Sequence, residues 1–69
     1  MNWCEAFAAY IRKLGLTQQD VAFQLKKSPS FIHYWIKDVR PRDEKVRKRI
    51  ERWSGGAVSA DLPAPARAA

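Results

Sequence analysis

The sequence predicts an all-α fold, a small bundle of four to five short helices. Four segments carry apolar residues at three- and four-residue steps, the spacing of one face of an amphipathic helix. Residues typical of helix N-caps begin the first three segments: Asn2, Thr17 and Ser28. A chain of 69 residues makes at most one domain with a small core, and this size favours short helices with short connections.

The first predicted helix spans Asn2–Leu14. Glu5 stands where it can complete a capping box, and Gly15 can end the helix in the left-handed conformation. The expected inward stripe follows steps of four, four and three residues: Trp3, Phe7, Ile11 and Leu14. Cys4 is expected to be a small, at least partly buried hydrophobe, and Tyr10 and Phe23 to be partly buried aromatic residues.

Two further helices are expected close together, over Thr17–Leu25 and Pro29–Lys37. Their apolar faces are Val21, Ala22 and Leu25 in one helix, and Phe31, Ile32, Trp35 and Ile36 in the other. Asp20 suits the first turn of the earlier helix, and the pair Ser28-Pro29 suits the start of the later one. A small residue at position 22, with apolar residues ten and fourteen positions later, is the internal pattern of a helix-turn-helix.

The opposite face of the Pro29–Lys37 helix is polar without being fully charged. It combines hydroxyl, imidazole, phenol and ammonium groups, from Ser30, His33, Tyr34 and Lys37. A face that meets only water more typically carries Glu and Lys, whereas donors and acceptors of moderate reach suit the edges of bases in a major groove. His33 alone would be weak evidence for a functional site, because a single histidine usually has a structural role or none.

The segment Asp38–Arg42 is expected to be an exposed connection, because Pro41 disfavours helix at Arg40. Arg40 and Arg42 flank this proline and are placed to grip a phosphate backbone. A fourth helix is predicted over Asp43–Trp53. Its inward stripe is Val46, Ile50 and Trp53, and cations surround its outside: Lys45, Arg47, Lys48, Arg49 and Arg52. Some of these cations should pair with acids at helical spacing.

The remaining chain is expected to turn back on the bundle. Ser54-Gly55-Gly56 ends the fourth helix, Ala57-Val58 suits a short extended piece, and Ser59–Leu62 suits a single capped turn. Val58 and Leu62 should fold onto the core or meet a second subunit. The domain is therefore placed at residues 1–62, and Pro63–Ala69 is expected to be a disordered tail of Pro and Ala.

The net charge of +6 is concentrated in one part of the chain. Ten Lys or Arg residues lie between Lys26 and Arg52 against four acids, and the rest of the chain carries three charges of each sign. A basic patch on a small domain is typical of a polyanion-binding protein, most often one that binds nucleic acid. The alternative is a solvated surface with a slight excess of cations.

Several functional classes are disfavoured. One cysteine makes no intrachain disulfide, and one cysteine with one histidine makes no zinc finger. No apolar stretch is long enough for a membrane span, and no secretory signal is visible, so a cytoplasmic protein is expected. An enzyme is least expected, because the sequence shows neither paired carboxylates nor a glycine-rich phosphate loop. No cofactor, metal or small-molecule ligand is expected.

The segments LTQQDVAFQL and SPSFIHYWI resemble the helix-turn-helix of the lambda-repressor-like family of phage Cro and CI proteins. The later run IERWSGGAVSADL is similar to the stretch that follows this motif in small Cro-type and YdaS-type prophage regulators. The resemblance covers about residues 7–63. It implies a lambda-repressor-like bundle and a repressor that binds a palindromic double-stranded DNA operator as a weak or DNA-assisted homodimer.

The resemblance also implies roles for individual residues. Gln18 matches a position that holds a phosphate at the start of the second helix. The positions that face bases are matched by Pro29, Ser30, His33 and Tyr34. The positions that reach the DNA backbone after the recognition helix are matched by Lys37, Arg40 and Arg42.

Two residues depart from the family pattern. Lys26 stands where the turn usually has glycine, and a left-handed conformation there would cost about 1–2 kcal/mol, so a differently built turn is expected. Pro29 stands where a glutamine often reads adenine, so the operator should differ from those of glutamine-bearing relatives. The rival interpretation is a YdaS-like antitoxin or another protein-binding module that also binds DNA. RNA binding is less expected, because no exposed aromatic platform is recognisable.

Overall fold

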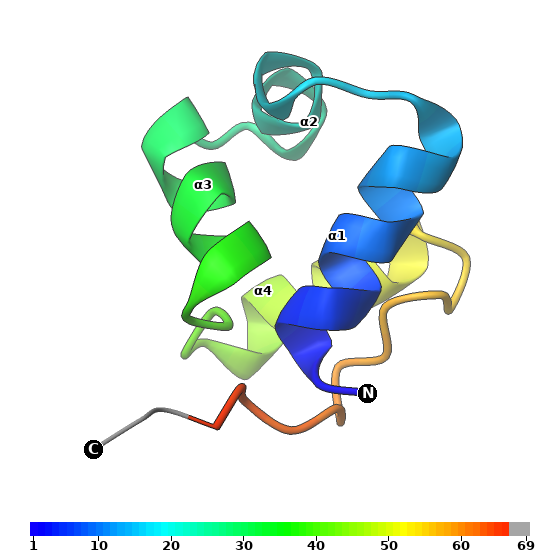
Figure 1. The fold of residues 1–69 in the computed structure, drawn as a ribbon, viewed down its shortest axis with the longest axis vertical. Helices are drawn as coiled ribbons and strands as arrows, with labels where there is room; N and C mark the ends of the chain where they lie inside the picture. The colour runs from blue at the N-terminus through cyan, green and yellow to red at the C-terminus, as the bar shows by residue number, and fades with distance from the viewer. Residues whose placement is uncertain (67–69) are drawn as a thin grey trace.

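The chain folds into four α-helices, as seen in a computed structural model that describes residues 1–66 (Figure 1). They are α1 (Trp3–Leu14), α2 (Gln18–Leu25), α3 (Pro29–Lys37) and α4 (Glu44–Trp53). Residues 1–66 contain no β-strand. The expected all-α bundle is therefore confirmed, and each helix begins and ends within a residue of its predicted bounds.

Local side-chain caps set the starts of α1 and α2. In α1, the Asn2 side chain accepts from the Glu5 backbone N–H at 2.8 Å, and the Glu5 carboxylate accepts from the Asn2 N–H at 2.9 Å. Thr17 and Asp20 make the same reciprocal pair at the start of α2, at 3.1 and 3.0 Å. Both capping boxes satisfy backbone donors that the first turn of a helix leaves free.

The start of α3 is built differently from a side-chain cap. Ser28 occupies the N-cap position, but its side chain makes no capping hydrogen bond. Its carbonyl accepts from the Phe31 N–H at 3.1 Å, and Pro29 follows at the first helical position. The fixed φ of proline is compatible with the first turn, so α3 begins without help from the serine hydroxyl.

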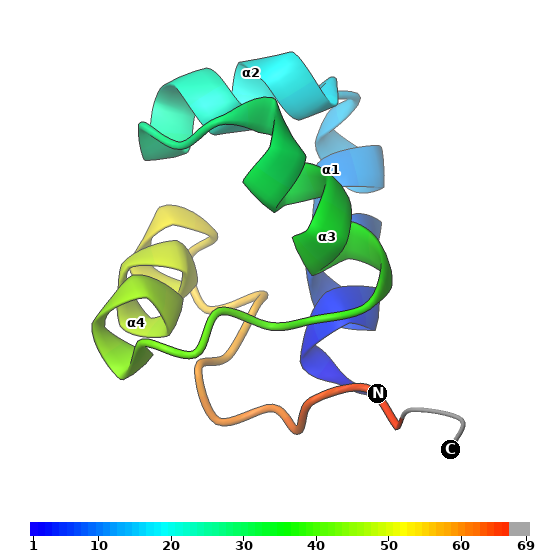
Figure 2. The ribbon, with the colours of Figure 1, turned by 90° about the vertical axis from the view of Figure 1, so that its left-hand side faces the viewer.

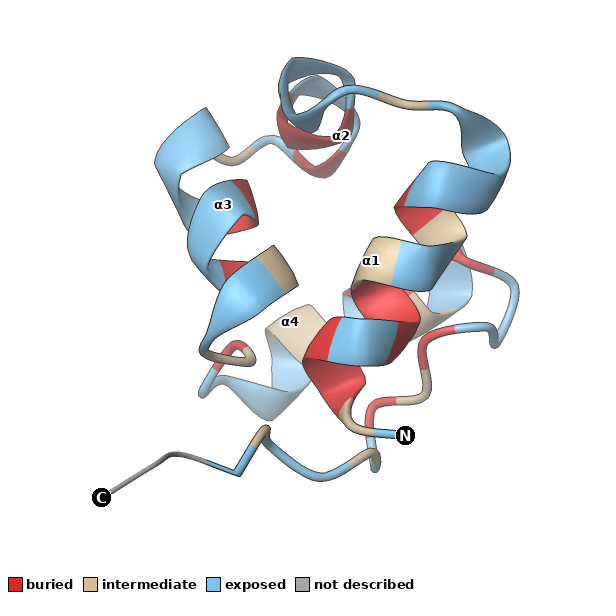
Figure 3. Ribbon diagram, viewed as in Figure 1, coloured by how far each residue is buried: buried red, intermediate tan, exposed pale blue. Residues whose placement is uncertain are grey.

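An aromatic cluster joins α1 to α3 and α4. The Trp3 and Phe7 rings stack with centroids 4.8 Å apart, and Trp35 meets them edge-on at 6.3 and 6.2 Å. Trp53 adds a fourth ring 6.3 Å from Phe7, and its indole Nε1–H donates to the Gln24 side chain of α2 at 2.9 Å. Figure 3 shows the buried positions of the helices turned toward this shared interior.

In α1 and α2, two expected core positions are wrong. Leu14 is 48% exposed and Phe23 is 86% exposed. Leu14 is the last residue of α1, directly before the left-handed Gly15, and its side chain is left at the exposed end of the helix. Leu16 packs against the core instead, and its N–H donates to the Ile11 carbonyl at 3.2 Å in the manner of a Schellman cap. Phe23 lies on the outer face of α2, opposite Val21 and Leu25.

Lys26 takes the left-handed conformation in the turn between α2 and α3, with φ 56° and ψ 45°. The expectation that the turn would avoid this conformation is therefore wrong. Two backbone bonds hold the strained residue: the Lys26 N–H donates to Phe23 at 3.3 Å, and the Lys27 N–H donates to Ala22 at 2.9 Å. These contacts, with the packing of α2 on α3, offset the cost of a side chain at positive φ.

The C-terminal segment (residues 57–66) wraps back beside α1 (Figures 1 and 2). Val58 is fully buried, and its N–H donates to the Ser54 hydroxyl at 3.0 Å. The predicted turn at Ser59–Leu62 is confirmed by the 3.2 Å bond from the Leu62 N–H to the Ser59 carbonyl. The short extended piece expected at Ala57-Val58 is absent, because the chain bends there. Val58 and Leu62 thus pack on the core of their own chain.

Pro63 is held in place, although it was assigned to a disordered tail. Its carbonyl accepts from the Trp3 N–H at 2.8 Å, which ties the start of α1 to the C-terminal segment. Pro65 is half-buried. The last three residues of the expected tail, 67–69, lie outside the described residues.

Trp35→Ala should lower the free energy of unfolding by about 3–5 kcal/mol, because it deletes the ring that joins α3 to Trp3 and Phe7. The matched control is Phe23→Ala, which removes an exposed ring and should change stability by less than about 0.5 kcal/mol. Urea unfolding followed by circular dichroism measures both. Equal losses for the two variants would show that Trp35 is not a core residue.

Lys26→Gly should stabilise the domain by about 0.5–1 kcal/mol, because relief of the left-handed strain exceeds the added entropy of the unfolded chain. Lys27→Gly is the control, since Lys27 is not at positive φ and its replacement should only destabilise, by up to about 1 kcal/mol. Thermal unfolding distinguishes the opposite signs. Destabilisation by both glycines would contradict the observed turn.

Candidate nucleic-acid interface

Helix α3 lies on one side of the bundle, crossing near α2 and leading into the α3–α4 connection (Figure 2). Ile32 and Trp35 are buried and hold α3 against the core, and Ile36 is half-buried beside them. The remaining face is therefore turned to solvent along the whole helix. Phe31 departs from its predicted place in the core: it is 53% exposed and rests against the Trp35 ring, with centroids 5.9 Å apart.

Five of the predicted site residues line one surface hollow: Gln18, Pro29, Ser30, His33 and Tyr34. All five are exposed. The hollow lies where the first turn of α2 meets the first half of α3, so it joins segments that are more than ten residues apart in sequence. The His33 and Tyr34 rings stand edge-to-face, 5.9 Å between centroids. The structure thus brings together the residue expected to hold a phosphate and the residues expected to face bases.

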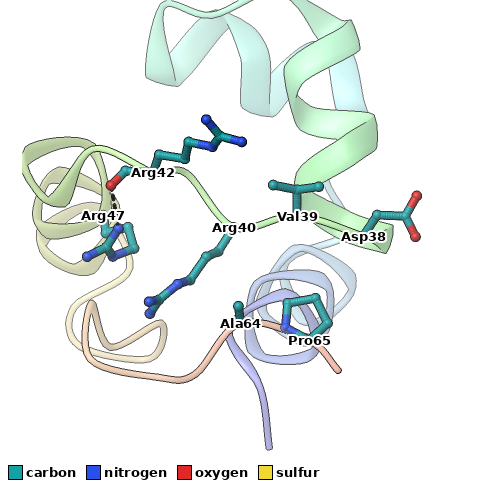
Figure 4. Close-up of a pocket in the computed structure, with 7 residues that line it drawn as sticks. All are labelled: Asp38, Val39, Arg40, Arg42, Arg47, Ala64 and Pro65. Atoms are coloured by element: carbon teal, nitrogen blue, oxygen red, sulfur yellow. Dashed lines mark hydrogen bonds between the residues drawn. The ribbon is translucent and has the colours of Figure 1, made fainter. Parts of the chain in front are cut away.

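Lys37 and Arg42 extend this surface beyond α3. Lys37 is the last helical residue and is exposed. Arg42 is exposed in the connection, and Figure 4 shows its side chain extending away from Arg40, toward the side of the molecule where α3 lies. Both cations can reach a ligand that lies along the outer face of α3.

Arg40 does not stand on an exposed loop, as the sequence suggested. It is half-buried, and its Nη1 donates to the Leu62 carbonyl at 2.6 Å. The sequence shows a basic connection around Pro41 but not the C-terminal segment that returns beside it. Arg40 is therefore a tie between the connection and the C-terminal segment, on a different side of the connection from Arg42 (Figure 4).

Arg47 is another arginine that was expected on the outside of α4 and is instead half-buried. Its Nε donates to the Ala60 carbonyl at 3.1 Å, and its Nη1 donates to the Pro41 and Arg42 carbonyls at 2.7 and 2.9 Å. It lies one residue after Val46 on the inward side of α4. The position of Arg47 next to Val46 weakly predicts its partial burial, because the buried face of an amphipathic helix is wide enough to include residues beside the apolar ones.

The positive charge of this region is largely unpaired. Within residues 1–66, the one ion pair joins Lys48 to Glu44 at 3.7 Å, with both side chains more than half exposed. An exposed pair of this kind contributes little to stability. The pair expected at helical spacing in α4 is thus confirmed, and within residues 1–66 no other cation between Lys26 and Arg52 forms an ion pair.

An apolar hollow adjoins the α3 surface on the side of the α3–α4 connection. Its lining includes Phe31, Tyr34, Trp35, Val39 and Val46. Lys27 and Arg42 stand at the same hollow as cations. The sequence did not reveal it, because Phe31 was assigned to the core and the course of the connection depends on tertiary contacts.

Three further features of residues 1–66 concern metal binding, membrane crossing and thiol reactivity. Residues 1–66 hold no group of three or more His, Cys, Asp and Glu side chains placed to bind a metal ion. No helix in the same part of the chain is long and apolar enough to cross a membrane. Cys4 is buried, and this burial, with smaller contributions from the charges of Asp38 and Glu5, raises the pKa of its thiol. A thiol kept neutral in this way is a poor nucleophile.

In comparisons with known proteins, no family model, no curated protein and no solved structure matches this chain.

Cys4 should react with a neutral alkylating reagent much more slowly in the folded protein than in the urea-unfolded protein at pH 8.

The raised pKa of the Cys4 thiol also affects stability at alkaline pH, because above the ordinary value of 9.0 the unfolded thiol ionises while the folded thiol keeps its proton. The stability that Cys4 contributes is thus fully present below pH 9 and is lost as the pH rises further. In Cys4→Ala this part of the alkaline loss should disappear; an unchanged pH profile would show that Cys4 ionises normally.

Proposed function

We propose that this protein is a sequence-specific, double-stranded DNA-binding transcriptional repressor of the phage Cro type, with α3 as the helix that enters the major groove. The observation that carries the proposal is the shared hollow of Gln18 and the outer face of α3. It puts a polar helix start beside side chains that can reach base edges. The unpaired positive charge of residues 26–52 supports the same partner.

The dimensions of α3 fit this role. A helix with its side chains is about 10–12 Å across, so a major groove about 12 Å wide admits it. The nine residues of α3, at about 1.5 Å each, make it roughly 13 Å long. Ser30, His33 and Tyr34 each present a hydrogen-bonding group on the solvent side, whereas Pro29 offers only an apolar contact, such as to a thymine methyl. The recognition is therefore assigned to three polar side chains with Pro29 beside them.

Contacts with the DNA backbone are assigned around this helix. Gln18 is the first residue of α2, where free backbone N–H groups and the helix dipole favour a phosphate oxygen. Lys37 and Arg42 are exposed on the other end of α3 and suit the same strand or the next. Phosphate contacts supply most of the affinity, and base contacts select the sequence.

A palindromic operator follows from pairing two copies of this domain. In such a homodimer, weak or formed only on DNA, the two α3 helices would lie about 34 Å apart, one turn of the double helix. Occupancy of the operator would exclude RNA polymerase. The proposed location is the cytoplasm of a bacterial host. Selection of bound duplexes from a random pool tests all of this, because an operator dimer should yield a palindrome with fixed half-site spacing.

The apolar hollow beside α3 favours one second candidate, a YdaS-like antitoxin or other protein-binding module that also binds DNA. Phe31 and Val39 would then meet an apolar side chain of a partner. Co-purification with the product of an adjacent gene, lost on Phe31→Ser, would support it. Retention of the partner in that variant would remove the hollow as its binding site.

Alanine at Ser30, His33 or Tyr34 should relax the preference for one operator position by about 1–3 kcal/mol and leave binding to unrelated duplexes nearly unchanged. Arg42→Ala is the contrast, because loss of a phosphate contact should weaken binding to all sequences and lower the salt slope by about one. Binding isotherms at several salt concentrations separate the two patterns. Uniform losses from all four variants would refute the assignment of base-reading residues.

A further inference from the structure

Arg40 and Arg47 line one cavity of about 480 Å³ between the α3–α4 connection and the C-terminal segment (Figure 4). Arg42 lines it as well, but its side chain extends away from Arg40. Val39 belongs to one wall of this cavity, and Ala64 and Pro65 belong to the other. Segments more than twenty residues apart in sequence therefore line it, and it is open to solvent. The volume is many times the roughly 30 Å³ share of one water molecule, so a polyatomic anion with bound water fits.

Backbone carbonyls fix both guanidinium groups in this cavity. Arg40 donates to Leu62, and Arg47 donates to Ala60, Pro41 and Arg42, over distances from 2.6 to 3.1 Å. A guanidinium has five N–H donors. Within the part of the chain that the structure describes, Arg47 uses three of its donors and Arg40 uses one, so about six N–H groups of the pair have no protein acceptor.

The charges of the two arginines are not neutralised. Carbonyl oxygens are dipoles and leave each guanidinium with its full charge. Asp38 is the acid that lines the cavity, but it forms no ion pair with either arginine within residues 1–66, and its carboxylate points away from both of them (Figure 4). Two half-buried cations with carbonyl partners alone are a costly arrangement, because partial burial removes water without supplying a counter-charge.

We propose that Arg40 and Arg47 bind one phosphate-sized oxyanion in the cavity between the α3–α4 connection and the C-terminal segment. A tetrahedral phosphate accepts hydrogen bonds in several directions, so it can join two forks that come from different elements. A carboxylate has only two oxygens in one plane and matches a single fork better. The site does not rest on the proposed function, because it takes free phosphate and a phosphodiester alike.

The test uses inorganic phosphate and the intact chain at pH 7. Phosphate should shift the Nε–Hε resonances of Arg40 and Arg47 along a saturable curve, and chloride at equal ionic strength should not. A linear drift shared by chloride, or an equal shift at the exposed Arg49, would overturn the site. This measurement needs no variant, so it stands even if a substitution unfolds the domain.

Arg40→Gln should weaken phosphate binding about tenfold, the value of one charge-assisted hydrogen bond. The matched control is Arg49→Gln, which removes the same charge from an exposed position of α4 and should change the phosphate affinity less than twofold. Equal weakening by the two variants would show that phosphate senses only net charge, and the proposal would fail.

A second arm identifies the source of the phosphate. If Arg40→Gln also loses more affinity for duplex DNA than Arg49→Gln, and phosphate competes with the duplex, the site takes a phosphodiester of DNA. If the two variants bind duplexes equally, the site takes free phosphate or a small phosphorylated molecule. Saturable phosphate binding without any duplex binding would leave the site in place and refute the proposed repressor function alone.

Discussion

The contact on which the whole domain depends is the meeting of Trp35 with Trp3 and Phe7. It joins the first helix to the third across the centre of a very small core. Because α3 has only two buried side chains, Ile32 and Trp35, this contact also determines which face of α3 is left for solvent. The surface assigned to DNA is thus a direct consequence of how one indole ring packs.

Outside this aromatic cluster, side-chain hydrogen bonds between segments help to hold the bundle together. The Trp53 indole N–H donates a hydrogen bond to the Gln24 side chain, and Arg47 donates hydrogen bonds to three backbone carbonyls of the connection and the C-terminal segment. A domain of this size buries a modest fraction of its surface and is only marginally stable, so several hydrogen bonds of about 1 kcal/mol each count in its free energy of unfolding. The irregular chain after α4 is consequently part of the fold. It supplies the fully buried Val58 and the acceptors for two arginines.

Much of the architecture could be predicted from the sequence, because its causes are local. Asn2 with Glu5 and Thr17 with Asp20 mark helix starts within four residues, and helical periodicity alone places Ser30, His33 and Tyr34 on one outer face. The fates of Leu14, Phe23 and Arg40 could not be predicted in this way. Leu14 depends on where the helix stops, Phe23 on which side of α2 the rest of residues 1–66 covers, and Arg40 on a carbonyl twenty-two residues away. The hollow that joins Gln18 to α3 likewise exists only once the two helices are packed.

The bond from the Trp3 N–H to the Pro63 carbonyl has a consequence for the order of folding. During synthesis the first helix emerges early, but its opening turn and the largest aromatic ring in it are fastened by residues made after all four helices. Val58, which fills the same interior, also arrives late. The growing chain can form its helices in turn, yet the full set of core contacts is available only once this last stretch has left the ribosome.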